Sequence, residues 1–185
     1  IFFSLLPKYL MLSIFIFCKY FSSGIITIVF LNQSIIVDVG LGEDISLSQS
    51  LIETHGCTIH GFDPTPKAIE FVEKQNQPKL ILHKFRLGGT SRMARFFLPN
   101  ETAHVSGSIL QVEHVGIQEI SVDLLSIKDL LELIKAESIS LLKIDIEGAE
   151  YEFIDSSDFE QLSSKIDVIC IEFHHRSEER RVGKE

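Results

Sequence analysis

The sequence has few cysteines and no excess of basic residues. Its three cysteines, Cys18, Cys57 and Cys170, lie far apart and form no CxxC pair. A zinc site or a disulfide framework needs closely spaced or paired cysteines, so neither is expected. Lysine and arginine together number 17 against 26 acidic residues, and the net charge is -9. Because nucleic acids bind basic surfaces, this balance argues against a nucleic-acid partner.

The length and composition are typical of one globular domain. The chain has 185 residues, of which 45% are hydrophobic and 23% charged. We expect this domain at 34–175. The chain begins at Ile1 rather than Met, so we expect a fragment. The highly charged residues 176–185 have no periodicity and are expected to be a disordered or artefactual tail.

The first 33 residues are strongly apolar. A membrane helix needs about 20 apolar residues in a row, but Lys19 and the Ser-Ser-Gly group at 22–24 divide this run. We expect a helix or leader at 5–18 and a strand at 24–31. Membrane contact through 1–31 is the less favoured alternative, so the expected location is cytoplasmic, with membrane association left open.

Beyond residue 33, apolar strands alternate with amphipathic helices. Strands are predicted at 34–40, 57–63, 79–85, 94–98, 118–123, 140–148 and 165–175, and helices at 45–56, 64–75, 124–137 and 149–157. Such alternation predicts an α/β fold with a doubly wound, mostly parallel sheet. Ligands of these folds bind beyond the carboxyl ends of the strands, at the point where the strand order reverses.

The stretch after the first of these strands is a glycine loop. Gly40 and Gly42 permit a tight turn and close approach of a ligand to the backbone. A dinucleotide fingerprint would have a third glycine where Ile45 stands. The acidic Glu43 and Asp44 are also unfavourable beside a pyrophosphate. The loop therefore favours a cationic ligand, although a purely structural turn is an alternative.

Asp63 follows the next strand, about 20 residues beyond the glycine loop. An acidic side chain at this spacing can accept hydrogen bonds from ribose hydroxyls, which supports a nucleoside ligand. The alternative is a turn or helix cap beside Pro64.

Three charged residues, Lys143, Asp145 and Glu147, alternate at the end of a later strand and so share one side of it. Burying such charges is costly unless they have a function or partners. In the alternative reading, Lys143 pairs with a carboxylate and the others cap the helix that contains Glu150.

The segment LLKIDIEGAEYEFI resembles the most recognisable signature of the FkbM-type methyltransferases, a branch of the class I enzymes that depend on S-adenosylmethionine (SAM). The segments VDVGLGED, GFDPTPKAIEFV and ICIEFHH also fall where that family has its corresponding segments, so the resemblance covers 35–175. It implies a Rossmann-like sheet, SAM as cofactor, and methylation of a hydroxyl on a sugar, glycolipid or small-metabolite acceptor.

The resemblance also implies cofactor-binding roles for individual residues. Asp38, Gly40 and Gly42 would line the methionine end of SAM, and Asp63 would hold its ribose.

Asp145 and Glu147 are the residues that the resemblance places near the transferred methyl group. An alcohol acceptor benefits from a base, and an imidazole suits this role near neutral pH. His174, on the same strand face as Glu172, is favoured as this base over His175. No histidine and carboxylate cluster has a convincing metal-ligand spacing, so no required metal is expected.

Class I enzymes usually finish with an antiparallel hairpin, whereas this chain ends soon after 165–175. The fold is therefore expected to be truncated before that hairpin, with one sheet edge bare. Two alternatives to a methyltransferase remain. One is an NAD-linked oxidoreductase, and the other is a non-catalytic, truncated methyltransferase-like binding domain.

Overall fold

The structure is a computed structural model, and it describes residues 13–18, 30–98, 118–146 and 149–174. Its centre is a six-stranded sheet in the order β1-β9-β8-β2-β3-β4. These strands are β1 (Ser13–Cys18), β2 (Ile35–Val39), β3 (Thr58–Phe62), β4 (Leu80–His83), β8 (Ile139–Ile144) and β9 (Ile166–Phe173). Five strands run parallel, and β1 pairs antiparallel with β9.

The strand order reverses between β2 and β8. From β2 the chain proceeds outward to β3 and β4, whereas β8 and β9 lie on the other side of β2. In a doubly wound sheet, this switch point leaves a crevice at the carboxyl ends of the two central strands. Asp38 of β2 lies directly opposite Lys143 of β8 in the register at this position.

Helices cover both faces of the sheet, as the sequence predicts. They are α1 (Ser46–His55), α2 (Pro66–Gln75), α3 (Ile127–Ile134), α4 (Glu150–Ile154) and α5 (Ser157–Leu162), with a short 3-10 turn, η1 (Ser163–Lys165). One apolar cluster joins α1 and α2 to one face, and a second joins α3, α4 and α5 to the other. Side chains alternate between the two faces along β2, so Ile36 belongs to the cluster with α1 and Val37 to the cluster with α3.

Local sequence signals account for several helix boundaries. The chain leaves α1 through Gly56, whose φ of 67° is readily adopted only by glycine. Pro66 occupies the first turn of α2, where its missing N–H costs nothing. The Ser126 side chain caps α3 by accepting a hydrogen bond from the Asp129 N–H. These signals explain why the predicted helices form close to the expected positions.

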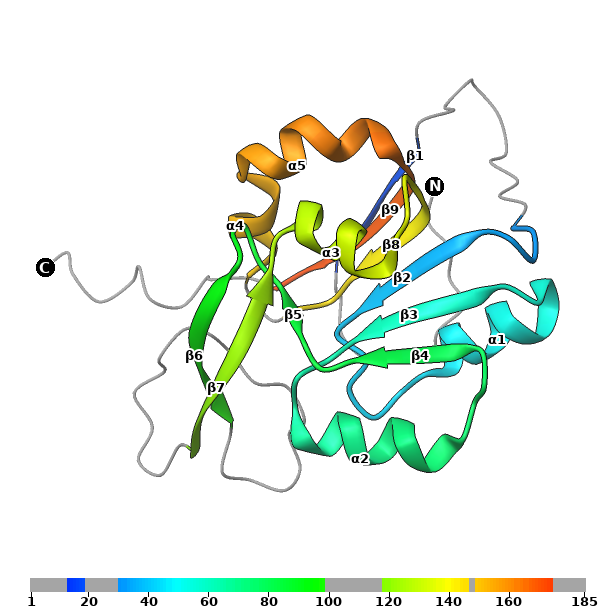
Figure 1. Cartoon of the computed structure of the whole chain (residues 1–185), viewed down its shortest axis with the longest axis horizontal. Coiled ribbons are helices and arrows are strands. Elements are labelled where there is room, and N and C mark those ends of the chain that lie inside the picture. The colour runs from blue at the N-terminus through cyan, green and yellow to red at the C-terminus, as the bar shows by residue number, and fades with distance from the viewer. Residues whose placement is uncertain (1–12, 19–29, 99–117, 147–148, 175–185) are drawn as a thin grey trace, which may run out of the picture.

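A second, three-stranded sheet has the order β5-β7-β6. It comprises β5 (Arg86–Leu87), β6 (Arg92–Leu98) and β7 (Gln118–Leu125). The carboxyl ends of β2, β3 and β4 point towards this small sheet (Figure 1). The sequence predicts β6 and β7 but not β5 or α5, since a two-residue strand and a six-residue helix are too short to show periodicity.

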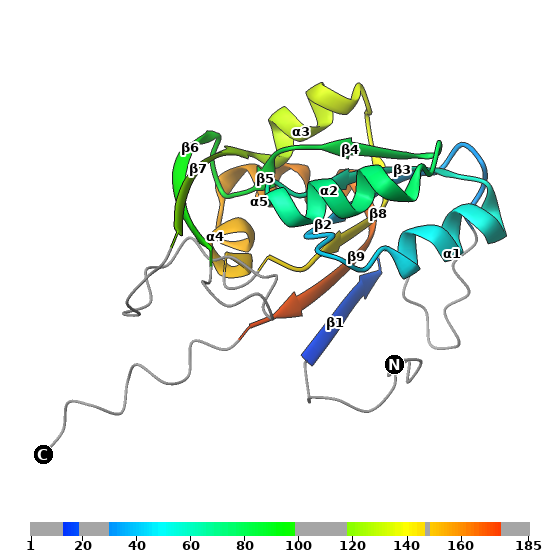
Figure 2. The ribbon, with the colours of Figure 1, turned by 90° about the horizontal axis from the view of Figure 1, so that it is seen from below.

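The structure corrects two expectations for the N-terminal segment. Residues 13–18 form the strand β1 and not a helix, and Leu31, at the end of the strand expected at 24–31, lies outside any strand. The rest of that expected strand lies almost entirely outside the described residues. The edge of β9 is also not bare, because β1 pairs with it from Ser13–Phe173 to Cys18–Val168 (Figures 1 and 2).

Physical chemistry explains this difference. An apolar segment satisfies its backbone groups equally well in a helix or in a sheet, and an open sheet edge offers it unpaired N–H and C=O groups. Among the described residues, no helix combines the length and the hydrophobicity needed to cross a bilayer.

Candidate functional site

The glycine loop after β2 is held tightly against its neighbours. The Gly40 N–H donates to the Phe62 carbonyl at 2.9 Å, and the Asp145 N–H donates to the Val39 carbonyl at 3.0 Å. Gly40 has a φ of 82°, and a Cβ on it would lie 1.7 Å from the Asp145 carbonyl oxygen. Only glycine therefore permits the loop to approach the end of β8 this closely.

Asp63 ties this loop to the segment after β3. Its Oδ2 accepts a hydrogen bond from the Gly42 N–H at 3.0 Å, and its Oδ1 accepts from the N–H and hydroxyl of Thr65 at 2.9 and 2.6 Å. The turn role that the sequence left open is therefore present. Each carboxylate oxygen has more than one acceptor direction, so these bonds are compatible with a further bond to a ribose hydroxyl.

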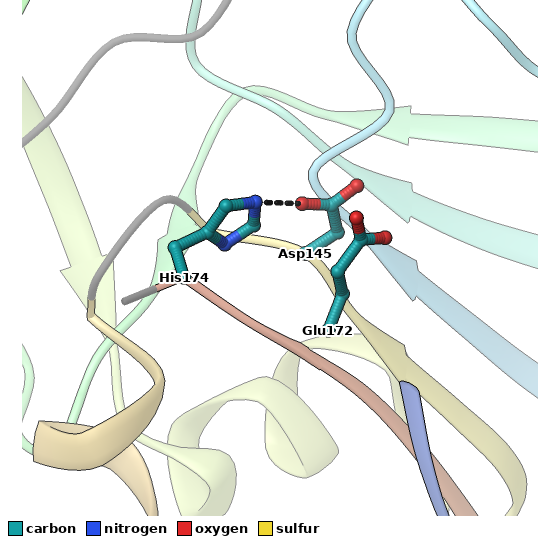
Figure 3. Close-up of side chains that lie close together, drawn as sticks. All are labelled: Asp145, Glu172 and His174. Atoms are coloured by element: carbon teal, nitrogen blue, oxygen red, sulfur yellow. Dashed lines mark ion pairs between the residues drawn. The ribbon is translucent and has the colours of Figure 1, made fainter. Parts of the chain in front are cut away.

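Asp145, Glu172 and His174 converge beside the carboxyl ends of β8 and β9 (Figure 3). Each side chain offers one ligand atom, and these atoms lie within 4.8 Å of one another. The sequence pattern did not predict such a cluster. Glu172 lies in β9 and His174 directly follows that strand, but only the pairing of β8 with β9 brings Asp145 beside them.

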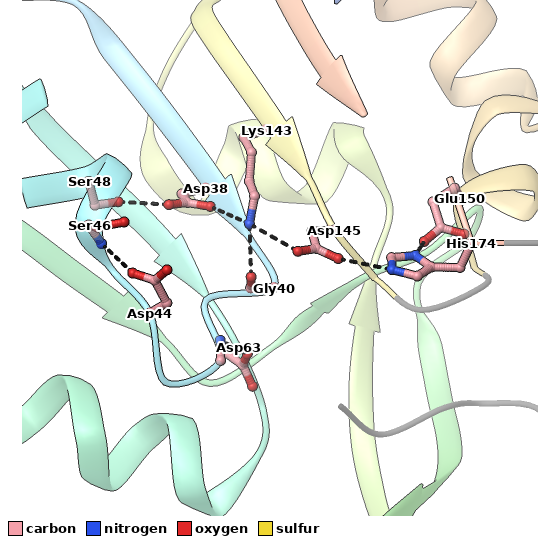
Figure 4. Close-up of polar contacts among 11 residues, drawn as sticks. Asp38, Gly40, Asp44, Ser46, Ser48, Asp63, Lys143, Asp145, Glu150 and His174 are labelled. Atoms are coloured by element: carbon pink, nitrogen blue, oxygen red, sulfur yellow. Dashed lines mark hydrogen bonds and ion pairs between the residues drawn. The ribbon is translucent and has the colours of Figure 1, made fainter. Parts of the chain in front are cut away.

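Lys143 lies between two carboxylates at the switch point (Figure 4). Its Nζ is 3.3 Å from Oδ1 of Asp38 and 3.6 Å from Oδ2 of Asp145, and it donates to the Gly40 carbonyl at 3.0 Å. The other oxygen of Asp38 accepts from the Ser48 hydroxyl at 2.7 Å. The sequence alternative in which Lys143 pairs with a carboxylate is thus what the structure shows.

The charge of Lys143 follows from these neighbours. Burial by itself lowers the pKa of the ammonium group, but the carboxylates of Asp38 and Asp145 outweigh burial and raise the pKa above its ordinary value. Lys143 is therefore cationic at neutral pH. It partly neutralises the two carboxylates and fixes the backbone of the glycine loop.

His174 is held from both sides. Its Nδ1 lies 2.9 Å from Oε1 of Glu150, a fully buried carboxylate, and its Nε2 lies 3.6 Å from Oδ1 of Asp145 (Figure 4). The bond to Glu150 orients the imidazole ring, so that Nε2 is the nitrogen facing Asp145.

The acidic residues beside the glycine loop differ in role. The Asp44 carboxylate accepts a hydrogen bond from the Ser46 N–H at 2.8 Å, at the start of α1. This backbone hydrogen bond, aided by the Ser46 side chain, lowers the pKa of Asp44. Asp44 thus stabilises the entry into α1, whereas Asp38 points towards Lys143.

The structure brings together most of the residues singled out from the sequence. Lys143 links Asp38 to Asp145, and Asp145 in turn faces His174. The adjoining loop contains Gly40 and Gly42, and Asp63 is bonded to it through Gly42. Glu147 and His175 lie outside the described residues.

Sequence reasoning missed three contributors to this region. Glu150 was considered only as a helix residue, although it ends the D-x-E-G-x-E motif at 145–150, within the segment LLKIDIEGAEYEFI. Ser48 gives no signal beyond a polar position in a helix. Arg86 is buried and donates to the Ile146 carbonyl, next to Asp145. The motif was therefore the available signal for Glu150, whereas the other two contacts depend on tertiary packing.

Comparisons with known proteins place the chain in a family. The family model of the methyltransferase FkbM domain matches residues 41–183, which is well over half of the chain. A solved structure of methyltransferase FkbM from Methylobacillus flagellatus KT resembles the chain with a TM-score of 0.47 and 17% identity. The match covers 78% of this chain and 33% of that one, so the chain spans about a third of its length. No curated protein sequence matches.

The resemblance stated from the sequence is thus confirmed by the family match, and the observed topology is the doubly wound one it implied. The chain belongs to the FkbM methyltransferase family.

Proposed function

We propose that the chain carries the SAM-dependent catalytic domain of a methyltransferase that methylates a hydroxyl group on a sugar, glycolipid or small metabolite. The observation that carries this proposal is the gathering of acidic side chains around the glycine loop. Asp38 lies next to the last residue of β2, and Asp63 and Asp145 directly follow the adjoining parallel strands β3 and β8. A cationic sulfonium compound is a better partner for this charge than a pyrophosphate.

The donor side of the proposed site is the glycine loop. Gly40 and Gly42 bring backbone groups close to the methionine end of SAM, with Asp38 behind them. Asp63 receives the ribose hydroxyls while it keeps its bonds to Gly42 and Thr65. These four residues are the same ones that the family resemblance implies.

The acceptor side is the cluster at the ends of β8 and β9. Methyl transfer from a sulfonium is an in-line displacement, so alignment of the acceptor oxygen contributes much of the acceleration. The acceptor hydroxyl must also lose its proton. Asp145 and His174 face each other across 3.6 Å and are the described groups that meet both needs. We assign Glu147 to this side by its position in the motif.

The NAD-linked alternative is weaker. Ile45 stands in place of the third glycine of a dinucleotide fingerprint and is buried in the core. Asp38 and Asp44 also surround the turn that would have to hold the pyrophosphate. The family match adds support for a methyl donor over a nicotinamide.

Calorimetry with S-adenosylhomocysteine and NAD side by side tests the donor. We expect the full chain to bind S-adenosylhomocysteine with a Kd on the order of micromolar and NAD much more weakly. Asp63→Asn should weaken S-adenosylhomocysteine binding about 10- to 100-fold, because a charged acceptor of a hydrogen bond contributes about 1.5–3 kcal/mol. Asp158→Asn, on α5 across the sheet, is the matched control and should change nothing.

Tighter binding of NAD, or equal binding by the Asp63→Asn variant, would contradict the proposal. Transfer of a labelled methyl group to a panel of sugars, glycolipids and metabolites then tests catalysis. S-adenosylhomocysteine binding without transfer to any acceptor would instead favour the non-catalytic alternative.

A further inference from the structure

The cluster of Asp145, Glu172 and His174 has the composition of a metal site. Its three ligand atoms come from the ends of two neighbouring parallel strands and lie within 4.8 Å of one another (Figure 3). All three residues are half-buried. We propose that these side chains bind a divalent transition-metal cation on the acceptor side of the site, with Glu150 as a positioning residue for His174.

The distance between the two facing atoms suits a shared ion. Nε2 of His174 and Oδ1 of Asp145 are 3.6 Å apart, which is too long for a hydrogen bond. With metal–ligand bonds of about 2.1 Å, two ligands of one ion lie about 3.0 Å apart at a right angle and about 4.2 Å apart when opposite. The observed 3.6 Å falls between these limits, and the atoms of the whole set, which lie within 4.8 Å of one another, reach one ion with a side-chain shift of less than about 1 Å.

Glu150 supplies an independent observation, because it lies outside the three ligand residues. Its carboxylate is fully buried and lies 2.9 Å from Nδ1 of His174 (Figure 4). When Nδ1–H donates a hydrogen bond to the Glu150 carboxylate, the lone pair of the ring lies on Nε2, which faces Asp145. Histidine ligands of metals commonly have this arrangement, in which the second nitrogen is held by a carboxylate.

The local charge also favours a cation. Four carboxylates gather here, those of Asp38, Asp145, Glu150 and Glu172. Among the residues that the structure describes, Lys143 and the buried Arg86, which donates to the Ile146 carbonyl, are cations in this region. A divalent ion would offset the remaining repulsion between the facing carboxylates.

The ligand types select the kind of ion. Ca²⁺ and Mg²⁺ prefer oxygen ligands, whereas an imidazole together with two carboxylates suits a first-row transition metal such as Mn²⁺. The use of this ion rests on the proposed function. An acceptor hydroxyl bound to a divalent cation loses its proton more readily. In that case His174 holds the ion in place of the role as base proposed above, and the proton of the acceptor hydroxyl passes to water.

Mn²⁺ titration of the full chain tests the proposal, with free Mn²⁺ followed by electron paramagnetic resonance after dialysis against a chelator. We expect one Mn²⁺ per chain, bound more tightly than Mg²⁺ or Ca²⁺. Asp145→Asn, Glu172→Gln and His174→Gln should each weaken binding by at least about tenfold, and Glu150→Gln by about 10- to 100-fold. Glu152→Gln is the matched control, because Glu152 lies on the same helix but pairs with Arg92 at 2.8 Å.

Two results would overturn the metal proposal without affecting the proposed methyltransferase function. Absence of Mn²⁺ binding at millimolar concentration, or binding that the three ligand variants leave unchanged, would exclude the metal site. Because Glu150 is buried, the Mn²⁺ affinity of its variant is interpreted only if the variant keeps the thermal unfolding transition of the wild type. If it does not, the variants of the partly exposed ligand residues provide the test. S-adenosylhomocysteine binding is measured on the same samples. Retained nucleoside binding without Mn²⁺ binding would overturn the metal proposal and leave the methyltransferase proposal intact.

Discussion

Gly40 lies where the loop after β2 touches the segment after β8. Its φ is 82°, and a Cβ at this position would lie only 1.7 Å from the Asp145 carbonyl oxygen, which leaves no room for a side chain. Gly42 also has a positive φ, 56°, but among the described residues, its chain neighbours aside, no atom lies within 4 Å of its Cβ position. A side chain at Gly42 would therefore introduce backbone strain alone, whereas a side chain at Gly40 would introduce both backbone strain and steric overlap.

Substitution of each glycine by alanine should have different effects. Gly42→Ala should lower the free energy of unfolding by about 1–2 kcal/mol, the cost of a left-handed conformation. Gly40→Ala should lower it by about 2–4 kcal/mol, because the overlap with Asp145 adds to this strain. Chemical denaturation of both variants measures the difference. Equal losses would show that the loop moves away from β8 without cost.

At the residue scale, the sequence predicted which side chains would gather but not how they are bonded. Asp38 lies near the end of β2, and Asp63 and Asp145 directly follow β3 and β8, strands that the pattern located correctly, so their common location was predictable. The pairing of Lys143 with two carboxylates was one of two open readings. The bond between Glu150 and His174 joins residues 24 positions apart, and no local pattern specifies such a contact.

At the scale of elements, β3 and β4 carry a pair of histidines across their shared edge. Nδ1 of His60 lies 3.0 Å from Nε2 of His83, and the two rings stack. Burial lowers the pKa of His60, and burial together with the neighbouring His60 lowers the pKa of His83. The folded protein therefore resists protonation of this pair.

This pair should make stability depend on pH. Because the folded pKa is lowered, the unfolded chain takes up protons first as the pH falls below 6.5, the ordinary value for histidine. The free energy of unfolding should therefore fall as the pH drops from about 6.5 towards the lowered pKa values of the folded pair, and this contribution should level off below them. His83→Gln should reduce this slope in denaturation curves recorded across the acidic range. Ile81→Gln, an exposed position on β4, removes no titrating group and should keep the wild-type slope.

An unchanged slope in the His83→Gln variant would show that other groups cause the pH dependence.

The elements themselves were predicted well where periodicity extended over several residues. β5 and α5 escaped prediction because each is too short for a pattern. The segment of β1 was predicted as a helix or leader because an apolar run without alternation does not distinguish a helix from a strand.

At the scale of the molecule, β1 closes one edge of the sheet. It pairs with β9 over six residues, although the two strands come from opposite parts of the sequence. An exposed strand edge offers unpaired backbone groups to water and to other chains. β1 thus covers the edge that the sequence pattern predicted to be bare.

Deletion of residues 1–18 should expose that edge. We expect faster hydrogen exchange in β9, about tenfold or more where an amide lost its partner, and self-association visible by size-exclusion chromatography. Peptides that cover β3, in the interior of the sheet, serve as the control and should exchange as before. Unchanged exchange in β9 would show that β1 contributes little to the sheet.

The sequence by itself determined the alternation of strands and helices, the glycine loop and the family motif, because each of these depends on neighbouring residues. Only the tertiary structure decided where β1 lies, how Lys143 is shared, and that Asp145, Glu172 and His174 meet. The physical reason is that these contacts join segments far apart in the chain, and their free energy depends on the register between strands. Local pattern carries no information about that register.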